Sequence, residues 1–222
     1  MELLDRIDAM IEDRHLLRHP FYTKWVAGTL PTQNLHDYAR QYYAFESNFP
    51  RFLSALHSRS DRPGVRAALL ENLWDEEHGE ANHQELWLRF AEGLGVARRD
   101  VMSATLNAAT DELLDTYGSV VSTASVTAGV AAIYAYERQV PPVAQAKIDG
   151  LKRWYGISDE RTLCFFDVHS TLDVEHSEAE RRIVGEANPQ EEGEVIRATS
   201  AALEAWWSFL DAVDAKEGSV AL

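Results

Sequence analysis

Hydrophobic residues recur every three to four positions along most of this chain, which is the spacing of an amphipathic α-helix. Leu3, Leu4, Ile7, Met10 and Ile11 begin the pattern, and it fades near "RHP". The spacing returns in segments containing residues 35–49, 51–59, 62–95, 109–118, 126–139, 143–156, 161–176 and 202–213. No segment shows the alternating pattern of a strand. We therefore predict one all-α domain over residues 1–222, with seven or eight helices.

Prolines and capping residues predict where these helices end. Pro50 is expected to kink or divide its helix, because proline lacks the N–H that a helix interior needs. Pro141–Pro142 should break the uncharged helix before them, and Ser158 is the expected N-cap of the helix that follows. Asn188–Pro189 separates that helix from the last one. Segment 62–95 is predicted to be one long helix that glycines stop.

Composition and charge limit the classes of function. The formal net charge is −15, and no basic patch offers a surface for nucleic acid. The uncharged stretch 116–136 contains too many Ser, Thr and Gly residues for a membrane span, so a buried helix is expected there. Cys164 is the only cysteine, which excludes an internal disulfide and a Cys-rich zinc site. Without a secretory signal pattern, a cytoplasmic protein is expected.

The segment "HSTLDVEH" holds the first candidate metal ligands, His169, Asp173 and His176. At 100° per residue, Asp173 lies at about +40° and His176 at about −20° from His169, so all three share one helix face. Phe166 is nearly eclipsed with Asp173, which turns this face inward, where unpaired charge is costly. A solvated polar face with a fortuitous pair of histidines is the alternative.

Two further segments add candidate ligands. In "DEEHGEANH", Glu76 and His83 are seven residues apart and share a face, with Glu80 between them. An acidic surface helix explains this segment equally well. Glu137 ends the uncharged helix, and a carboxylate in such surroundings needs a partner. A metal or a cation from another helix would supply it.

Together these helices supply three histidines and three carboxylates, which suit iron and manganese. Helix bundles build di-metal sites from side chains that face inward. A ferritin-like site would need two Glu-x-x-His motifs, and only Glu80-x-x-His83 fits, with Asp173-x-x-His176 as a variant. The pattern better pairs Glu76 with His83 and adds Glu137 and the triplet of "HSTLDVEH".

That arrangement resembles the haem-oxygenase-like di-metal oxidases. Among them it is most similar to the p-aminobenzoate synthases of the type of the chlamydial protein associating with death domains. The residues that carry the resemblance are "HPFYTKW", "FPRFLSALHSR", "NLWDEEHGEANHQELW", "AGVAAIYAYERQVP", "AKIDGL" and the triplet His169, Asp173 and His176. The resemblance covers most of the chain and is weakest in the last helix.

The resemblance implies a seven-helix bundle of the TenA and PqqC type, with an Fe/Fe or Fe/Mn centre that activates O₂. It implies p-aminobenzoate synthesis for folate in a single, self-sacrificing turnover that also needs an external reductant. Tyr22 would supply the ring and Lys147 the amino nitrogen, with Tyr38 and Tyr136 as further aromatic residues near the site. Phe165 departs from the chlamydial relative, which has tyrosine there, so any relay through that tyrosine is absent from this chain.

Other functions remain open from the sequence. A TenA-like thiaminase would need a nucleophilic thiol, but Cys164 lies about 500° from His169 around the helix, away from the ligand face. A haem oxygenase would need His15 or His19 as the proximal ligand. A di-metal oxidase of an external small molecule and a non-enzymatic binding module are further alternatives. The sequence also leaves open whether the chain forms a homodimer.

Overall fold

Helices account for all the regular structure between residues 2 and 215, the part of the chain that the computed structural model describes. The helices are α1 Leu3–Asp13, the 3₁₀ turn η1 Leu16–Arg18, α2 Pro20–Ala27, α3 Thr32–Arg59, α4 Pro63–Glu77, α5 His83–Gly93, α6 Arg98–Met102, α7 Ala108–Thr123, α8 Val126–Glu137, α9 Val140–Trp154, α10 Glu160–Gly185 and α11 Glu192–Asp214. The all-α prediction is confirmed. The predicted number of helices was too low, because short helices such as α2 and α6 were not anticipated.

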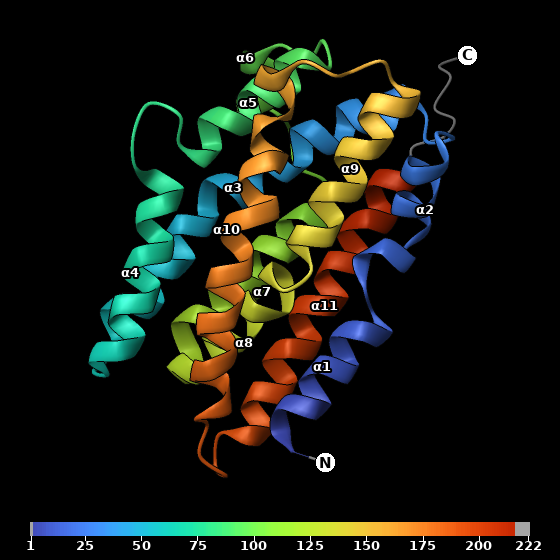
Figure 1. Cartoon of the computed structure of the whole chain (residues 1–222). Coiled ribbons are helices and arrows are strands. Elements are labelled where there is room, and N and C mark those ends of the chain that lie inside the picture. Colours follow the sequence, from blue (N-terminus) through green and yellow to red (C-terminus); the bar gives the residue numbers. More distant parts are fainter. Residues whose placement is uncertain (1, 216–222) are drawn as a thin grey trace.

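The uncharged helix α8 lies in the interior of the bundle, as predicted. Every residue from Thr127 to Glu137 is buried. The long helices α10 and α11 both pack against α8, and α9 lies beside α10 (Figure 1). Gly129 allows α8 to approach α3 closely, since a Cβ there would lie 2.3 Å from Leu56 Cδ2. The helix that carries Glu137 is therefore held from several sides.

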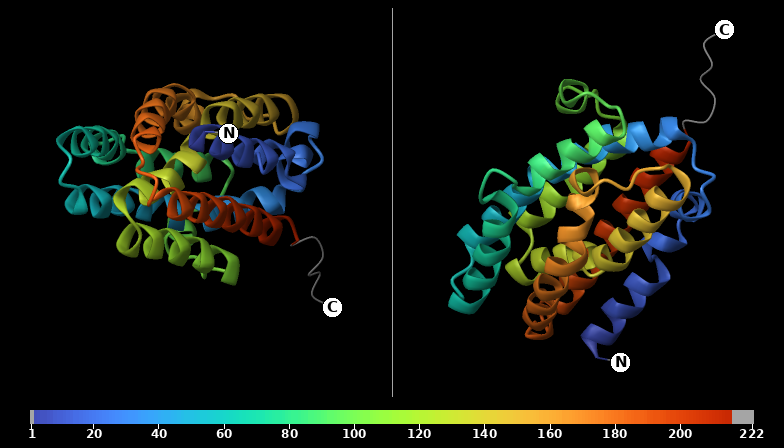
Figure 2. Two further views of the ribbon diagram at one scale, coloured as in Figure 1. Left: turned by 90° about the horizontal axis from the view of Figure 1, so that it is seen from below. Right: turned by 45° about the horizontal axis from the view of Figure 1, so that its top comes forward.

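Segment 62–95 is not one helix, contrary to the prediction. It forms α4 and α5, joined by a turn in which Gly79 has a φ of 86°, a conformation that glycine adopts readily. Asn82 then caps α5, because its side chain accepts a hydrogen bond from the Glu85 N–H at 3.0 Å. Figure 2 shows the α4–α5 pair along one side of the bundle. His83 consequently stands at the start of a new helix.

Pro50 lies inside α3, which continues to Arg59, so the predicted division of this helix was wrong, and a kink at Pro50 stays a prediction. The N-cap of α10 is Asp159 rather than Ser158, because the Asp159 carboxylate accepts a hydrogen bond from the Thr162 N–H at 2.9 Å. A carboxylate is also favoured over a hydroxyl by the positive end of the helix dipole.

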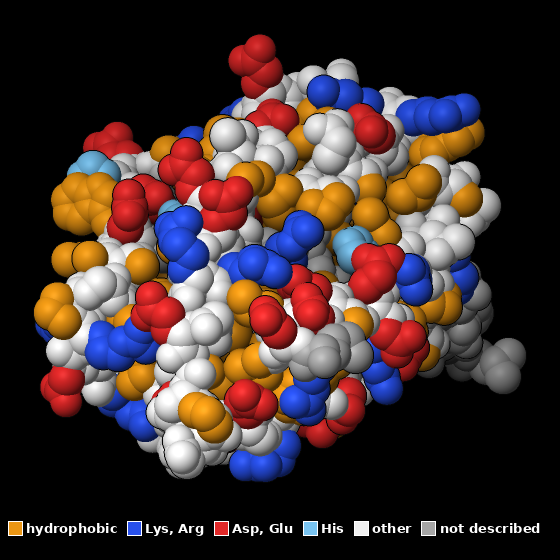
Figure 3. All heavy atoms as spheres, turned by 60° about the horizontal axis from the view of Figure 1, so that its bottom comes forward, with side chains coloured by type: hydrophobic (Ala, Val, Ile, Leu, Met, Phe, Trp, Pro, Cys, Tyr) orange, Lys and Arg blue, Asp and Glu red, His pale blue; other side chains and the backbone are white. Residues whose placement is uncertain are grey.

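The described surface is mixed in charge. On the face in Figure 3, Lys and Arg side chains are interspersed with Asp and Glu. Among the described residues, no helix is both long and apolar enough to cross a membrane. The assignment of residues 1–222 to a single domain stays a prediction, and residues 1 and 216–222 lie outside the described part.

Candidate metal centre

The six predicted ligands come from four helices, and all six are buried. Glu76 is near the end of α4, His83 begins α5, Glu137 ends α8, and the other three lie on α10. Their exposed fractions are Glu76 4%, His83 3%, Glu137 2%, His169 4%, Asp173 2% and His176 7%. Burial of so many ionisable groups is costly unless they are paired or bind a cation.

Hydrogen bonds fix how two of the histidines are oriented. His169 Nδ1 lies 2.7 Å from the Phe165 carbonyl oxygen, which can only accept, so Nδ1 carries the proton and Nε2 is free to bind. His176 Nε2 lies 3.1 Å from the Asp75 carboxylate. Its Nδ1 is buried and meets no hydrogen-bond partner in the described structure. A carboxylate or carbonyl behind a histidine is the usual support of a metal ligand.

The carboxylates of Glu76 and Glu137 also have defined neighbours. Glu76 Oε1 lies 2.9 Å from His83 Nδ1. Asn72, a buried residue of α4, donates through Nδ2 to both Glu137 oxygens, at 3.0 and 3.1 Å. Asn72 therefore supplies part of the pairing that the buried Glu137 was expected to need. Asn72 leaves the negative charge of Glu137 uncompensated.

The electrostatics of this interior favour a bound cation. Burial raises the pKa of Glu76, and the neighbouring Glu137 raises it further. Burial also raises the pKa of Asp173 and that of Glu180, and in both cases the neighbouring Glu137 is the next largest cause. Carboxylates so close together repel one another unless a proton or a cation lies between them.

The donor set fits a pair of iron or manganese ions. Free, buried donor atoms include Glu76 Oε2 and His176 Nδ1, which lack hydrogen-bond partners among the residues described. Imidazole and carboxylate are the ligands that non-haem iron and manganese use in helix bundles. The residues present therefore suit the metal centre that the resemblance implies.

The prediction that Glu80 shares a helix face with Glu76 and His83 was wrong, because Glu80 is exposed in the turn between α4 and α5. The face shared by Glu76, Glu80 and His83 was worked out for a continuous helix, and that helix ends at Glu77. Glu80-x-x-His83 is consequently no helical motif, and the ferritin-like alternative loses its support. Cys164 is free and half-buried on α10.

Two buried carboxylates of this interior, Glu46 on α3 and Glu180 on α10, were missed from the sequence. Ligand atoms of Glu46, His83 and His169 all lie within 4.8 Å of one another. A sequence signal existed for each. Glu46 continues the stripe of Tyr38 and Tyr42 at a spacing of four residues. Glu180 continues the ligand face of α10, four residues after His176.

Lys147 lies in a cluster of phenols close to these donors. Its Nζ donates a hydrogen bond to the Tyr38 hydroxyl at 2.7 Å, and the Tyr38 and Tyr22 hydroxyls are 3.2 Å apart. Nζ lies 5.5 Å from the centre of the Tyr22 ring, 5.1 Å from that of Tyr38 and 5.4 Å from that of Tyr42. Burial lowers the pKa of Lys147 to about 7. Much of this lysine is therefore a neutral amine near neutral pH.

Tyr22 lies in the short helix α2 and is buried. Burial raises the pKa of Tyr22 and of Tyr38, so both remain phenols with a hydrogen to lose. The hydroxyl of Tyr136 shares a hydrogen bond with that of Tyr42, and its ring stacks on Trp206 at 4.8 Å.

Phe165 is buried against the histidines. Its ring lacks the hydroxyl that a tyrosine at this position would place there. Its ring centre lies 4.1 Å from that of His169 and 6.3 Å from that of Tyr42. Trp87 packs on Phe165 at 4.8 Å and stacks on Tyr42 at 4.1 Å. The aromatic residues therefore connect the histidines to the phenol cluster without a hydroxyl at position 165.

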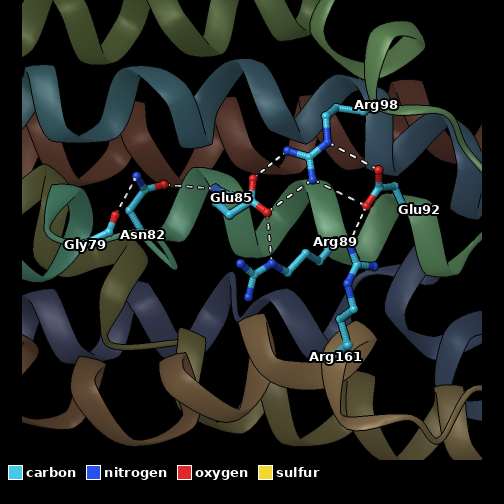
Figure 4. Close-up of polar contacts among 7 residues, drawn as sticks. All are labelled: Gly79, Asn82, Glu85, Arg89, Glu92, Arg98 and Arg161. Atoms are coloured by element: carbon cyan, nitrogen blue, oxygen red, sulfur yellow. Dashed lines mark hydrogen bonds and ion pairs between the residues drawn. The ribbon is translucent and has the colours of Figure 1, made fainter.

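Ion pairs anchor the helix that carries His83. Figure 4 shows Glu85 of α5 paired with Arg98, and Glu92 of the same helix paired with both Arg98 and Arg161. The hydrogen bond from Arg98 is the main cause that lowers the pKa of Glu85 to about 2, and a second hydrogen bond from Arg89 lowers it further. Arg161 belongs to α10, so the network links two of the helices that supply ligands.

Comparison with known proteins identifies similar chains. A family model described as an iron-containing redox enzyme matches residues 36–207. A 4-aminobenzoate synthase of Nitrosomonas europaea is 39% identical over 219 residues, covering 94% of this chain and 89% of that protein. A 4-aminobenzoate synthase of Chlamydia muridarum is 37% identical over 211 residues, covering 95% and 89%. The structure of a TenA homologue of Pseudomonas syringae superposes with a TM-score of 0.81 at 16% identity, covering 95% of this chain and 90% of that one. This last similarity shows the fold alone and confirms the predicted TenA-like bundle.

Proposed function

The chain belongs to the family of iron-containing redox enzymes, and from that premise we propose that it makes 4-aminobenzoate, which is p-aminobenzoate, in an O₂-dependent reaction. The relatives' activity and the position of Lys147 support the proposal. The single observation that carries it is a buried lysine with a pKa of about 7, hydrogen-bonded to a phenol beside a group of buried histidines and carboxylates.

We propose that Glu76, His83, Glu137, His169, Asp173 and His176 hold two metal ions, Fe/Fe or Fe/Mn. When bound, these ions supply the redox chemistry that O₂ and an external reductant drive. The residues of the chain orient the ligands: Phe165 and Asp75 fix the His169 and His176 rings, and Asn72 fixes the Glu137 carboxylate. We expect the reaction to take place in the cytoplasm, and a homodimer is compatible with it.

The product can be drawn from the protein's own side chains. In 4-aminobenzoate the carboxyl carbon lies para to the nitrogen, as Cβ of tyrosine lies para to the phenolic oxygen. A tyrosine can therefore supply the ring and the carboxyl carbon, if its Cα–Cβ bond breaks and nitrogen replaces the oxygen. Neutral Lys147 is the nearby amine that supplies this nitrogen, which requires its Cε–Nζ bond to break and the phenolic oxygen to leave as water. O₂ would be the oxidant that turns Cβ into the carboxyl carbon. Each chain would then react once.

Tyr22 is the tyrosine that the resemblance favours. Its ring and that of Tyr38 lie at similar distances from Lys147 Nζ, 5.5 and 5.1 Å. Loss of the phenolic hydrogen delocalises a radical onto the ring, which weakens the bond to the side chain and opens the oxygen-bearing carbon to the amine. Tyr38 accepts the hydrogen bond from Lys147, which suits a residue that positions the amine.

Isotope labelling tests the proposal. Protein made with ring-labelled tyrosine and ¹⁵N-lysine is loaded anaerobically with Fe(II), or with Fe(II) and Mn(II), and then given reductant and O₂. We expect doubly labelled 4-aminobenzoate, at no more than one per chain, and a peptide that has lost the Tyr22 side chain. Lys147→Arg should give no product, because guanidinium stays protonated and is a poor amine donor.

The same experiment separates the alternatives. Unlabelled product from added free tyrosine would make the chain an oxidase of an external small molecule. An intact Tyr22 with a lost Tyr38 or Tyr136 side chain would move the sacrificed residue. A loaded protein that makes no 4-aminobenzoate under any of these conditions would refute the proposed function.

A further inference from the structure

Glu46 is a buried carboxylate that the six-ligand centre does not use. It lies in α3, which supplies none of the six ligands, and it is 3% exposed. Its Oε1 meets no hydrogen-bond partner in residues 2–215. Such a group is costly to bury without compensation. His83 and Lys147 are basic groups that act on this carboxylate, but neither donates a hydrogen bond to Oε1, which is left open for a ligand.

The neighbours of Glu46 are metal-binding side chains. Ligand atoms of Glu46, His83 and His169 lie within 4.8 Å of one another, and the two imidazole ring centres are 4.3 Å apart. Donors about 2.1 Å from one ion lie about 3 Å apart at right angles and about 4.2 Å apart across it. Small side-chain movements are enough to bring the three donors onto one ion.

We propose that Glu46 is a seventh ligand of the metal centre, and that with His83 and His169 it holds one of the two ions. This inference rests on the metal centre proposed above. Two histidines and one carboxylate form the set that non-haem Fe(II) sites use, so this position should take iron. Glu46 would bring a fourth carboxylate and a fifth helix to the site.

The charge of the site supports a fourth carboxylate. Two divalent ions carry four positive charges, and Glu76, Glu137 and Asp173 supply three negative ones. The remaining positive charge would be buried, which is unfavourable in a low-dielectric interior. An ionised Glu46 or Glu180 would bring the sum to zero, and of these two buried carboxylates Glu46 is the one whose ligand atoms group with those of His83 and His169. Glu46 also follows Tyr42 by one helical turn on α3, so the ion that it holds would be adjacent to the phenol cluster.

Metal binding by matched variants tests the inference. Metal-free wild type, Glu46→Gln and Asp37→Asn are titrated anaerobically with ⁵⁷Fe(II) alone, and bound iron, affinity and Mössbauer spectra are measured. Asp37→Asn makes the same carboxylate-to-amide change on α3, about 13 Å along the helix axis from Glu46. Wild type and Asp37→Asn should bind two ions. Glu46→Gln should bind one, or the second at least about tenfold more weakly, as expected when a ligand is lost.

Thermal melting distinguishes a loss of metal binding from a general loss of stability in Glu46→Gln. Glutamine removes an uncompensated buried charge, so metal-free Glu46→Gln should melt at or above the wild-type temperature. The rise in melting temperature on adding Fe(II) should be smaller than in wild type, because one ion binds more weakly. Two ions with wild-type affinity, spectra and temperature rise in Glu46→Gln would overturn the role of Glu46 alone. A wild type that binds fewer than two ions would instead refute the proposed centre.

Discussion

Replacing Lys147 with methionine should stabilise the metal-free protein, although it removes a residue proposed to react. Lys147 is 5% exposed, and burial lowers its pKa from 10.5 to about 7. The protonated lysine is thus disfavoured in the folded state and fully favoured in the unfolded chain. Methionine has a similar shape without the charge, so the variant avoids this cost.

The magnitude follows from the shift. A lowering of about 3.5 units at about 1.36 kcal/mol each makes the protonated lysine cost about 5 kcal/mol below pH 7. Loss of the hydrogen bond to Tyr38 offsets about 1 kcal/mol of the gain. Between about pH 7 and 10.5 the unfolded chain keeps the proton that the folded protein has lost. The destabilisation that Lys147 causes should therefore shrink as pH rises through this window, by up to about 1.4 kcal/mol per unit.

Urea unfolding of the metal-free proteins, followed by circular dichroism, measures the effect. The free energy of unfolding of Lys147→Met should exceed that of wild type by about 4 kcal/mol near pH 6. Near pH 9 this difference should be smaller by about 2–3 kcal/mol. Lys152→Met is the control, because Lys152 is an exposed lysine of the same helix. A Lys147→Met protein that is less stable than wild type near pH 6, or a gain that does not change with pH, would refute a neutral buried amine.

Four further substitutions have definite expected outcomes. His176→Ala should sharply lower the amount of bound iron or manganese. Glu80→Ala, in the exposed turn, should leave that amount unchanged. Equal losses of metal in the two variants would contradict the ligand set. Tyr22→Phe should keep its metal but make no 4-aminobenzoate, because it has no phenolic hydrogen to lose; product detected by mass spectrometry would exclude Tyr22. Asn82→Ala should lower the free energy of unfolding by about 1 kcal/mol, because it removes the cap of the helix that begins at His83. An unchanged urea midpoint would show that this cap contributes nothing.

The part of the site that lies within one helix could be predicted from the sequence. His169, Asp173 and His176 share a face of α10, as the helical period requires, and all three are buried. The burial of Glu137 followed from the uncharged helix before it. Glu76 and His83 were chosen by an argument that assumed one helix. The structure brings them together through a turn instead, so those residues are adjacent for a different reason.

Contacts between helices could not be predicted from spacing. Asn72 reaches Glu137 from α4, and Asp75 reaches His176 on α10, because these helices pack together in the fold. The proximity of Lys147 to Tyr38 joins residues 109 positions apart, and no local pattern distinguishes Lys147 from a surface lysine. For Lys147 and Tyr38 the resemblance to a family supplied what the periodicity could not, whereas Asn72 and Asp75 were not predicted at all.

Metal binding should displace protons, because burial raises the pKa of the carboxylates, whereas it lowers the pKa of Lys147. Burial raises the pKa of Glu46, Glu76 and Asp173, so the metal-free fold favours their protonated forms. The stability that these protons give is complete below the unfolded pKa and is lost as pH rises through the folded pKa. A bound ion needs the ionised carboxylate, so binding must release protons, and its stabilising effect must grow as pH rises. Anaerobic addition of Mn(II) to weakly buffered, metal-free protein near pH 6.5 should release roughly one to three protons per chain, and His176→Ala should release fewer. Binding of two ions without proton release would show that these carboxylates are already ionised, and that their mutual repulsion is relieved by something other than protons.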